Sequence, residues 1–313
     1  MVIEGPTQLP TMVLPNLIKL DVEYDYDIDW LQGFRGATFG KLVTVTFRPG
    51  AKLTCDFLKA FESVALTTSA TATLSRFRLY TSHLWGPNYR SLLLFTQLRE
   101  LIIESPCGSV CSASVDNDTI VALARAMPKL ETLRLGDLPC REIPTGVTAE
   151  GLAVLARHCP DLSVLRVHFQ VATLSAPPVV GGMASNAGPS TPQRGCALKG
   201  FEVGFIPLPE ESVARVALTL VHIFPRITHL ICVDENWEKV MEAIWYSPGR
   251  AADHPSKEHP PLSVRRCNLS EPPPQEPHSG MIISRGTVRR DTTLTSLNHS
   301  ISLAYQNLHF LHA

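Results

Sequence analysis

One apolar pattern occurs twice in this chain at an interval of 32 residues. Apolar residues spaced i, i+3, i+4 and i+7 over Ile120–Met127, and again over Leu152–Cys159, predict two helices. Each helix is followed by an L-x-x-L-x-L pattern, at Leu130–Leu135 and at Leu162–Val167, which predicts a short strand. Units of one helix and one strand cannot bury their apolar faces alone, so the repeat predicts a solenoid of stacked units.

Further copies of the strand pattern extend this register along the chain. They begin at Leu17, Leu42, Leu74, Leu98, Leu198 and Ile227. A last amphipathic helix is expected over Trp237–Trp245. The sequence therefore predicts about eight units over residues 10–246, above the three that a stable stack requires.

Two segments depart from the repeat. Residues 175–196 are rich in proline, glycine and serine and replace an expected helix, which predicts an insertion loop. Residues 247–313 contain clustered prolines, scattered charge and no repeat register. We expect 247–280 to be disordered and 281–313 to be at most loosely structured.

Composition excludes several functional classes. The formal net charge is −1 and the pI is about 6.8, which gives no electrostatic reason to expect nucleic acid or an anionic membrane as partner. No secretory signal pattern is visible, and the longest helical apolar run, Val213–Phe224, is too short and too polar to span a bilayer. A cytoplasmic or nuclear protein with reduced cysteines is expected.

Motifs for chemistry are sparse. Cys107 and Cys111 have no companion pair at zinc spacing, and no nucleophile elbow, zinc-protease or phosphate-loop motif occurs. The sequence therefore predicts no enzyme, no metal and no cofactor.

The second repeat has a recognisable form. The run Gly151-Leu152-Ala153-Val154-Leu155-Ala156-Arg157-His158-Cys159-Pro160 and the strand ending at Val167 resemble the cysteine-type leucine-rich repeat of F-box proteins. More narrowly, the stretch from Pro139 to Gln170 is similar to filamentous-fungal F-box/leucine-rich-repeat proteins, and the Trp237 helix fits this resemblance.

The resemblance implies an α/β leucine-rich-repeat solenoid, with parallel strands on the concave face and helices on the convex face. It also implies a protein substrate held by the repeats, and an F-box that docks on the Skp adaptor of a cullin ubiquitin ligase. No L-P-x-E-[IL] segment precedes Leu17. We therefore expect Skp and cullin binding only if an F-box is restored upstream.

Other functions stay open at this point. The chain could be a stand-alone repeat scaffold or regulator without a link to ubiquitin, although the asparagine turn of GTPase-activating repeats does not recur regularly. It could also be a truncated gene product without activity.

Candidate binding residues come from the positions between the strand leucines, which should face the concave surface. Arg134 and Arg166 occupy the same position of consecutive strands, so like charges are expected side by side. Either Glu131 or Glu202 neutralises them internally, or an acidic or phosphorylated partner does so. The partner-binding prediction comprises Arg99, Arg134, Arg166, His168 and Glu202. It assumes an exposed positive ridge whose reversal to glutamate leaves folding intact.

A second candidate is the acidic run Asp21–Asp29, in which acidic residues alternate with apolar ones. Alternation at period two predicts an extended segment with one acidic face. A solvated edge is the simpler interpretation, and a site for a basic partner or a cation is the alternative.

Overall fold

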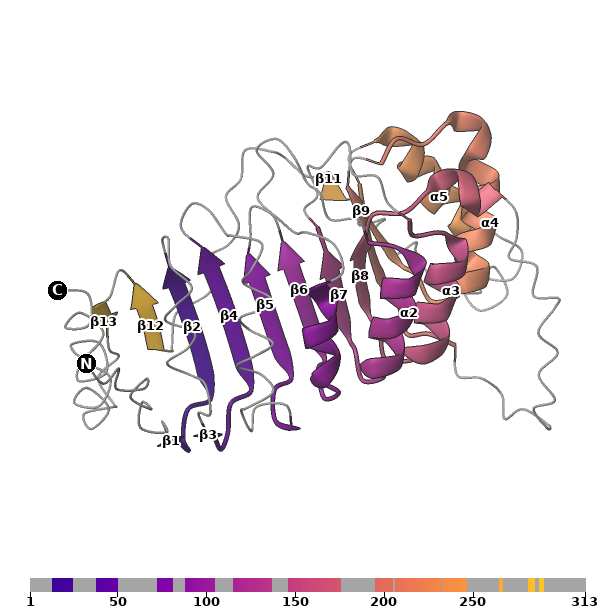
Figure 1. Cartoon of the computed structure of the whole chain (residues 1–313). Coiled ribbons are helices and arrows are strands. Elements are labelled where there is room, and N and C mark those ends of the chain that lie inside the picture. Colours follow the sequence, from indigo (N-terminus) through magenta and orange to yellow (C-terminus); the bar gives the residue numbers. More distant parts are fainter. Residues whose placement is uncertain are drawn as a thin grey trace, which may run out of the picture.

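The protein has an α/β fold dominated by one large sheet, as the computed structural model shows (Figure 1). The structure describes residues 13–24, 38–49, 72–80, 88–104, 115–136, 146–175, 195–204, 206–232, 234–246, 265–266, 281–284 and 287–289. The predicted loop within 175–196, the pair Cys107 and Cys111, and Asp25–Asp29 therefore lie mostly or wholly outside the described residues.

The main strands of this sheet follow one another in chain order. They are β2 (Lys19–Tyr24), β4 (Thr44–Pro49), β5 (Arg76–Tyr80), β6 (Glu100–Glu104), β7 (Thr132–Leu135), β8 (Val164–Val167), β9 (Gly200–Gly204) and β10 (His229–Cys232). All neighbours among these eight strands are parallel. Each coincides with one of the eight predicted strand patterns, so those predictions are confirmed.

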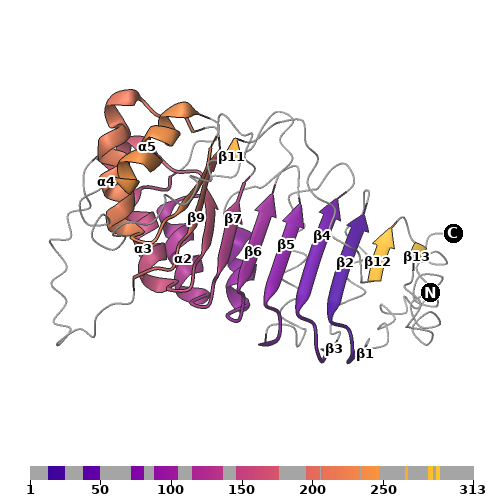
Figure 2. The ribbon, with the colours of Figure 1, turned by 180° about the vertical axis from the view of Figure 1, so that it is seen from behind.

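The register of the strands follows the sequence repeat. Leu133 pairs with Leu165 and Arg134 pairs with Arg166, one 32-residue interval apart. The strands run side by side across the molecule in Figures 1 and 2. The predicted parallel arrangement of 130–135 and 162–167 is therefore confirmed.

A repeated hydrogen-bond pattern joins consecutive units where each strand begins. The Glu131 carbonyl accepts from the amides of both Ser163 and Val164, at 2.8 and 3.1 Å. The same role belongs to the carbonyls of Ile18, Val43, Ser75, Arg99, Ser163 and Lys199. One carbonyl thus satisfies two amides of the next unit, and all eight strands begin at the same level.

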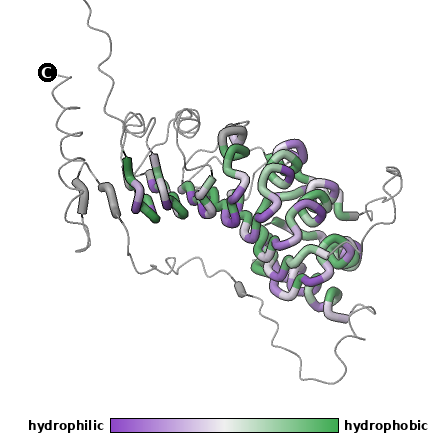
Figure 3. The backbone as a smooth tube through the Cα atoms, turned by 90° about the horizontal axis from the view of Figure 1, so that it is seen from below, coloured by the Kyte–Doolittle hydropathy of each residue, from purple (hydrophilic) through white to green (hydrophobic). Residues whose placement is uncertain are grey.

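Helices cover one face of the sheet. They are α2 (Asn117–Ala126), α3 (Ala149–His158), α4 (Val213–Ile223) and α5 (Glu235–Trp245). Shorter 3-10 helices are η3 (Asn88–Leu94), η4 (Val171–Ser175) and η5 (Glu210–Ser212). The four α-helices lie together beside the half of the sheet that ends at β10 (Figures 1 and 3).

The helix starts follow from capping side chains. The Asp116 carboxylate accepts from the Thr119 amide at 2.8 Å, and the Thr148 hydroxyl accepts from the Glu150 amide at 3.3 Å. Asn117 connects these two caps, because its side-chain amide donates to the Thr148 hydroxyl and its carbonyl accepts from the Thr148 backbone amide. Asp116 and Thr148 thus cap α2 and α3, and Asn117 connects the two neighbouring helix starts.

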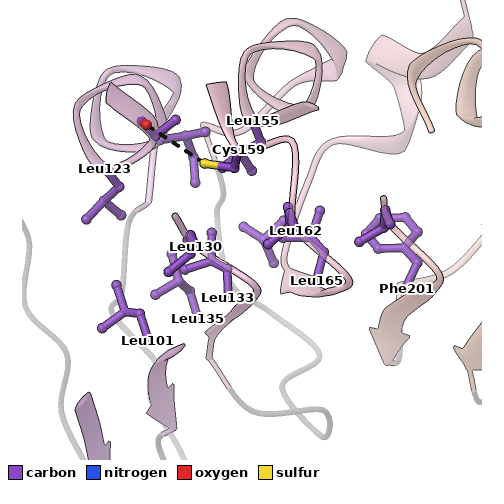
Figure 4. Packing of buried hydrophobic residues seen from close by; sticks show 14 of the residues in the cluster. Leu101, Leu123, Leu130, Leu133, Leu135, Leu155, Cys159, Leu162, Leu165 and Phe201 are labelled. Atoms are coloured by element: carbon purple, nitrogen blue, oxygen red, sulfur yellow. Dashed lines mark hydrogen bonds between the residues drawn. The ribbon is translucent and has the colours of Figure 1, made fainter. Parts of the chain in front are cut away.

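The core is a continuous nonpolar layer between the helices and the sheet. Leu133 and Leu165 are 0% exposed, and they pack with Leu123 and Leu155 from the helices above them (Figure 4). Along β5, β7 and β10, buried residues alternate with more accessible ones. The period-two pattern of the sequence thus places one row of each strand in the core.

The C-terminal region adds strands that the sequence analysis did not anticipate. β11 (Arg265–Arg266) pairs in parallel with β10, and β12 (Met281–Ser284) pairs in parallel with β2. β13 (Thr287–Arg289) pairs antiparallel with β12, and the main sheet then has eleven strands. These strands are too short to show a period of their own. The rest of 247–313 lies outside the described residues.

A smaller feature completes the described fold. β1 (Val13–Leu14) and β3 (Thr38–Phe39) form a separate two-stranded sheet.

Among the described helices, none is both long enough and apolar enough to cross a membrane.

Candidate functional site

The sheet has a second face, opposite the leucines, which we call the polar face. Its central row consists of one residue from each main strand, aligned by the strand register: Asp21, Thr46, Arg78, Ile102, Arg134, Arg166, Glu202 and Ile231. Side chains in such a row are about 4.8 Å apart, so each one meets its neighbours on both sides. The predicted alignment of Arg134 with Arg166 is confirmed.

Four charged residues on β6–β9 form a connected group, which we call the charge cluster: Glu104, Arg134, Arg166 and Glu202. One oxygen of Glu202, Oε1, accepts from Arg134 Nη2 at 2.6 Å, and Oε2 accepts from Arg166 Nε at 2.5 Å. Arg166 Nη1 also donates to Glu104 Oε1 at 2.9 Å. Two positive and two negative charges are therefore joined across four strands.

The ion pairs of Glu202 with the arginines are largely buried and therefore contribute to the stability of the fold. The Glu202 side chain is 3% exposed and that of Arg166 is 10% exposed. A charge removed from water to this extent needs a hydrogen-bonded counter-charge nearby. Glu202 lies between the two arginines as that counter-charge.

The expectation of an exposed positive ridge is therefore wrong. Arg166 is buried, and Glu202 neutralises both arginines, as one of the two internal alternatives predicted. Glu131, the other candidate, pairs with Arg99 instead. Reversing both arginines to glutamate would place like charges around buried Glu202, so we now expect that change to destabilise the fold.

Arg134 is the more accessible arginine of the charge cluster, because its side chain is 31% exposed. Its Nε is buried and has no hydrogen-bond partner in the described part of the chain. Glu202 engages only one edge of the Arg134 guanidinium, so the group keeps hydrogen-bonding capacity that Arg166 has already used.

The remaining predicted contact residues lie around this cluster. The Arg99 side chain is 58% exposed and bonds Glu131, 43% exposed. His168 follows the end of β8 and is half-buried. The structure thus places Arg99, Arg134 and His168 where solvent reaches them, whereas Arg166 and Glu202 hold Arg134 in position.

The other half of the polar face carries separate ion pairs. Arg48 donates to Asp21 at 2.6 Å, and Arg78 donates to Glu100 at 2.5 Å. Asp21 is 1% exposed, so the solvated-edge interpretation of the acidic run is wrong for this residue. Its Oδ2 is buried without a described partner.

Tyr80 lies next to these pairs, with the Arg48 guanidinium 5.7 Å from its ring centroid. Burial raises the pKa of the Tyr80 hydroxyl, and the nearby carboxylate of Glu104 raises it further. The phenol therefore stays neutral at physiological pH and offers a hydroxyl and an aromatic face.

Among the described residues, the opposite, nonpolar side of the sheet carries buried thiols. Cys159 Sγ donates to the carbonyls of Ala124 and Met127, at 3.8 and 3.6 Å. Burial raises the pKa of the Cys159 thiol to about 12 and also raises that of Cys196. These thiols are protonated at neutral pH and do not act as nucleophiles. Cys232 is also a buried free cysteine.

Sequence reasoning missed one member of the charge cluster. Glu104 occupies the row beside the central one, and its contact with Arg166 crosses two strands. The aligned rows were visible in the sequence, but a diagonal contact depends on side-chain conformation. Within the described ranges, no group of three His, Cys, Asp or Glu side chains is arranged to hold a metal ion.

Comparisons with known proteins add no identification. A scan against protein-family models gives no match, and a search of curated proteins gives no significant match.

Proposed function

We propose that residues 10–246 form a leucine-rich-repeat solenoid that binds another protein through the polar face. The observation that carries this proposal is the unbroken register of eight parallel strands in chain order. The shared carbonyl at each strand start keeps every unit at the same level. Stacked units of this kind create long surfaces suited to macromolecular partners.

The distribution of side chains supports the choice of face. The described α-helices pack on the leucine side, which leaves the polar face as the side lined by charged and hydrogen-bonding groups. Arg76 on β5 and His229 on β10 are exposed on this face, and Arg48, Tyr80 and Arg134 are partly exposed. Arginine and tyrosine are enriched at binding hot spots because each combines apolar contact area with hydrogen bonding.

The repeat form supports a more specific proposal, that this module corresponds to the substrate-recognition part of an F-box ubiquitin-ligase receptor. The supporting residues are the Gly151–Pro160 run and the strand that follows it, together with the α5 helix. In this proposal Arg99, Arg134 and His168 contact the partner, and Arg166 and Glu202 position Arg134. A scaffold unconnected to ubiquitin would use the same face.

The test compares matched charge reversals on the two faces. Arg76→Glu changes an exposed residue of the polar face, and Arg157→Glu makes the same change on the exposed side of α3. Both variants should melt like wild type, because exposed charges contribute less than about 1 kcal/mol. Partners enriched by affinity capture should be lost with Arg76→Glu and retained with Arg157→Glu.

A neutral change at the charge cluster extends this test. Arg134→Gln removes the accessible charge without reversing it, and should weaken capture of the same partners. If the captured partners are lost with Arg157→Glu but retained with Arg76→Glu, the proposal is refuted and the binding site lies on the helical face. Enrichment of Skp and cullin subunits with wild type would support the ligase role, and their absence beside a retained partner would favour the scaffold.

A further inference from the structure

The two edges of the main sheet are occupied by strands from the C-terminal region. Without them, the sheet would end at β2 on one side and at β10 on the other. β2 has six residues, and its unpaired backbone amides and carbonyls would form a template for another strand. Exposed edges of this length are sites of self-association in β proteins.

We propose that the segments Arg265–Arg266 and Met281–Arg289 form an edge cap that prevents a second copy of this chain from pairing with β2 or β10. β12 covers β2 through the register Leu20–Met281, Asp21–Ile282 and Val22–Ile283. β11 covers the last two residues of β10. The cap thus acts on both ends of the sheet.

The new edges have the properties of protected ones. The outermost strands are β13, with three residues, and β11, with two residues. β11 consists of two arginines, and β13 ends in an arginine. Very short edge strands and positive charges are the devices by which soluble β proteins avoid edge-to-edge pairing. β12 thus covers three of the six residues of β2, and the three-residue strand β13 becomes the outermost strand on that side.

Chain length allows one molecule to supply both parts of the cap. The order of strands puts β11 and β12 nine neighbour steps apart, which is about 43 Å at a spacing of ~4.8 Å. Fifteen residue steps from Arg266 to Met281 can reach about 54 Å. Capping within one chain therefore requires no second copy.

The hairpin of β12 and β13 also has local support in the sequence. Only Arg285 and Gly286 connect the paired residues Ser284 and Thr287. Two-residue connections are the commonest in hairpins, and glycine is favoured in them because it tolerates positive φ angles. The short connection therefore keeps β13 next to β12 once β12 pairs with β2.

Cysteine pairs test the register directly in the full-length chain. Val22 and Ile283 are paired, so Val22→Cys with Ile283→Cys should form a disulfide within one chain under mild oxidation. The matched control is Val22→Cys with Ile282→Cys, because neighbouring strand residues point to opposite faces. Peptide mass spectrometry separates the engineered bond from bonds between native cysteines.

Each outcome of this experiment decides the proposal. The cap is supported if a disulfide forms in the first pair but not in the control pair, and if the oxidised chain migrates as a monomer in a non-reducing gel. A bond between two chains would show that a second copy occupies β2, and equal yields for the two pairs would show that the register is absent. Either result overturns the proposal.

Self-association tests the role of the cap. Ile282→Pro combined with Ile283→Pro removes two amides from β12, so light scattering should show a shift from monomer to dimer or larger species. The control, Ile282→Val with Ile283→Val, keeps strand propensity and should stay monomeric. If the proline variant keeps the wild-type melting transition and remains monomeric, the cap does not protect the edge, and the proposal fails.

Discussion

Leu165 and Arg166 are adjacent residues of β8 that are buried in opposite ways. Leu165 is 0% exposed in a layer of aliphatic side chains, whereas Arg166 is 8% exposed on the polar face between two carboxylates. Nonpolar burial stabilises through the area removed from water and tolerates small changes of geometry. Burial of an arginine depends on particular partners and fails when one of them is removed.

This difference indicates which side of the sheet can change its residues from one unit to the next. Every main strand contributes buried nonpolar residues to the leucine side, whereas the central row of the polar face changes from unit to unit. A repeat can therefore keep one core while it carries a different set of contacts on the other face.

The largest effect is expected at the leucine side. Leu165→Ala leaves a cavity in a layer without solvent access, and should lower the free energy of unfolding by roughly 2–5 kcal/mol. Urea unfolding monitored by circular dichroism measures this change. Since the substitution leaves the polar face intact, a loss no greater than that of an exposed substitution would show that Leu165 is not a core residue.

A smaller but substantial loss is expected at the charge cluster. Glu202→Ala leaves Arg134 and Arg166 facing each other without their carboxylate. We expect a loss of about 2–3 kcal/mol, below the usual upper range for buried pairs because Arg134 can be rehydrated. Glu104→Ala is the control, since Glu104 is 23% exposed and bonds only Arg166 of the two arginines. Equal losses from the two variants would contradict a central role for Glu202.

These two sites also show how far sequence reasoning extends. Leu165 and its equivalents were predictable, because period two assigns each strand residue to one face and the 32-residue interval aligns the strands. The presence of Glu202 beside the arginines was predictable as one of two alternatives. The choice between Glu131 and Glu202 was not, because it depends on how long side chains reach across two strands.

The strands at the sheet edges were beyond such reasoning for another reason. β11 and β12 have two and four residues, too few for a periodic signal. Their pairing depends on the free edges of β10 and β2, which exist only after the repeats have folded. The pairing of these strands depends on tertiary structure and cannot be predicted from the residues of a short stretch of sequence.

The helix layer offers a third prediction, at the shared caps. A Cβ added to Gly151 would lie 2.3 Å from Asn117 Oδ1, so Gly151→Ala must displace the side chain that links the two caps. We expect a loss of roughly 1–3 kcal/mol from this overpacking. In an Asn117→Ala background there is no Asn117 amide to displace, so Gly151→Ala should lower the free energy of unfolding by less than it does in the wild-type chain. Additive losses in the double-mutant cycle would contradict this contact.

The buried thiols predict an effect of pH. The pKa of Cys159 is about 12 in the folded chain, against an ordinary value near 9.0, so the folded state holds its proton more tightly. The contribution of this thiol to the free energy of unfolding is complete below pH 9 and is lost as the pH rises towards 12. By pH 10 this group should account for roughly 1 kcal/mol of lost stability. Comparing unfolding at pH 7.5 and pH 10 should show a shallower decline for Cys159→Ala than for wild type, and parallel declines would contradict the assignment.

The smallest effect is expected where charges meet solvent. Arg99 and Glu131 form an ion pair, but both side chains are more than two-fifths exposed. Arg99→Ala should therefore change the free energy of unfolding by less than about 0.5 kcal/mol, and added salt should remove even that difference. The measurement is urea unfolding at low and high ionic strength, beside Glu202→Ala. Because water screens Arg99 but not Glu202, the Glu202 effect should largely persist in salt. A loss at Arg99 as large as that at Glu202 would show that ion pairs on this sheet stabilise independently of burial, and that the contrast between Leu165 and Arg166 has another cause.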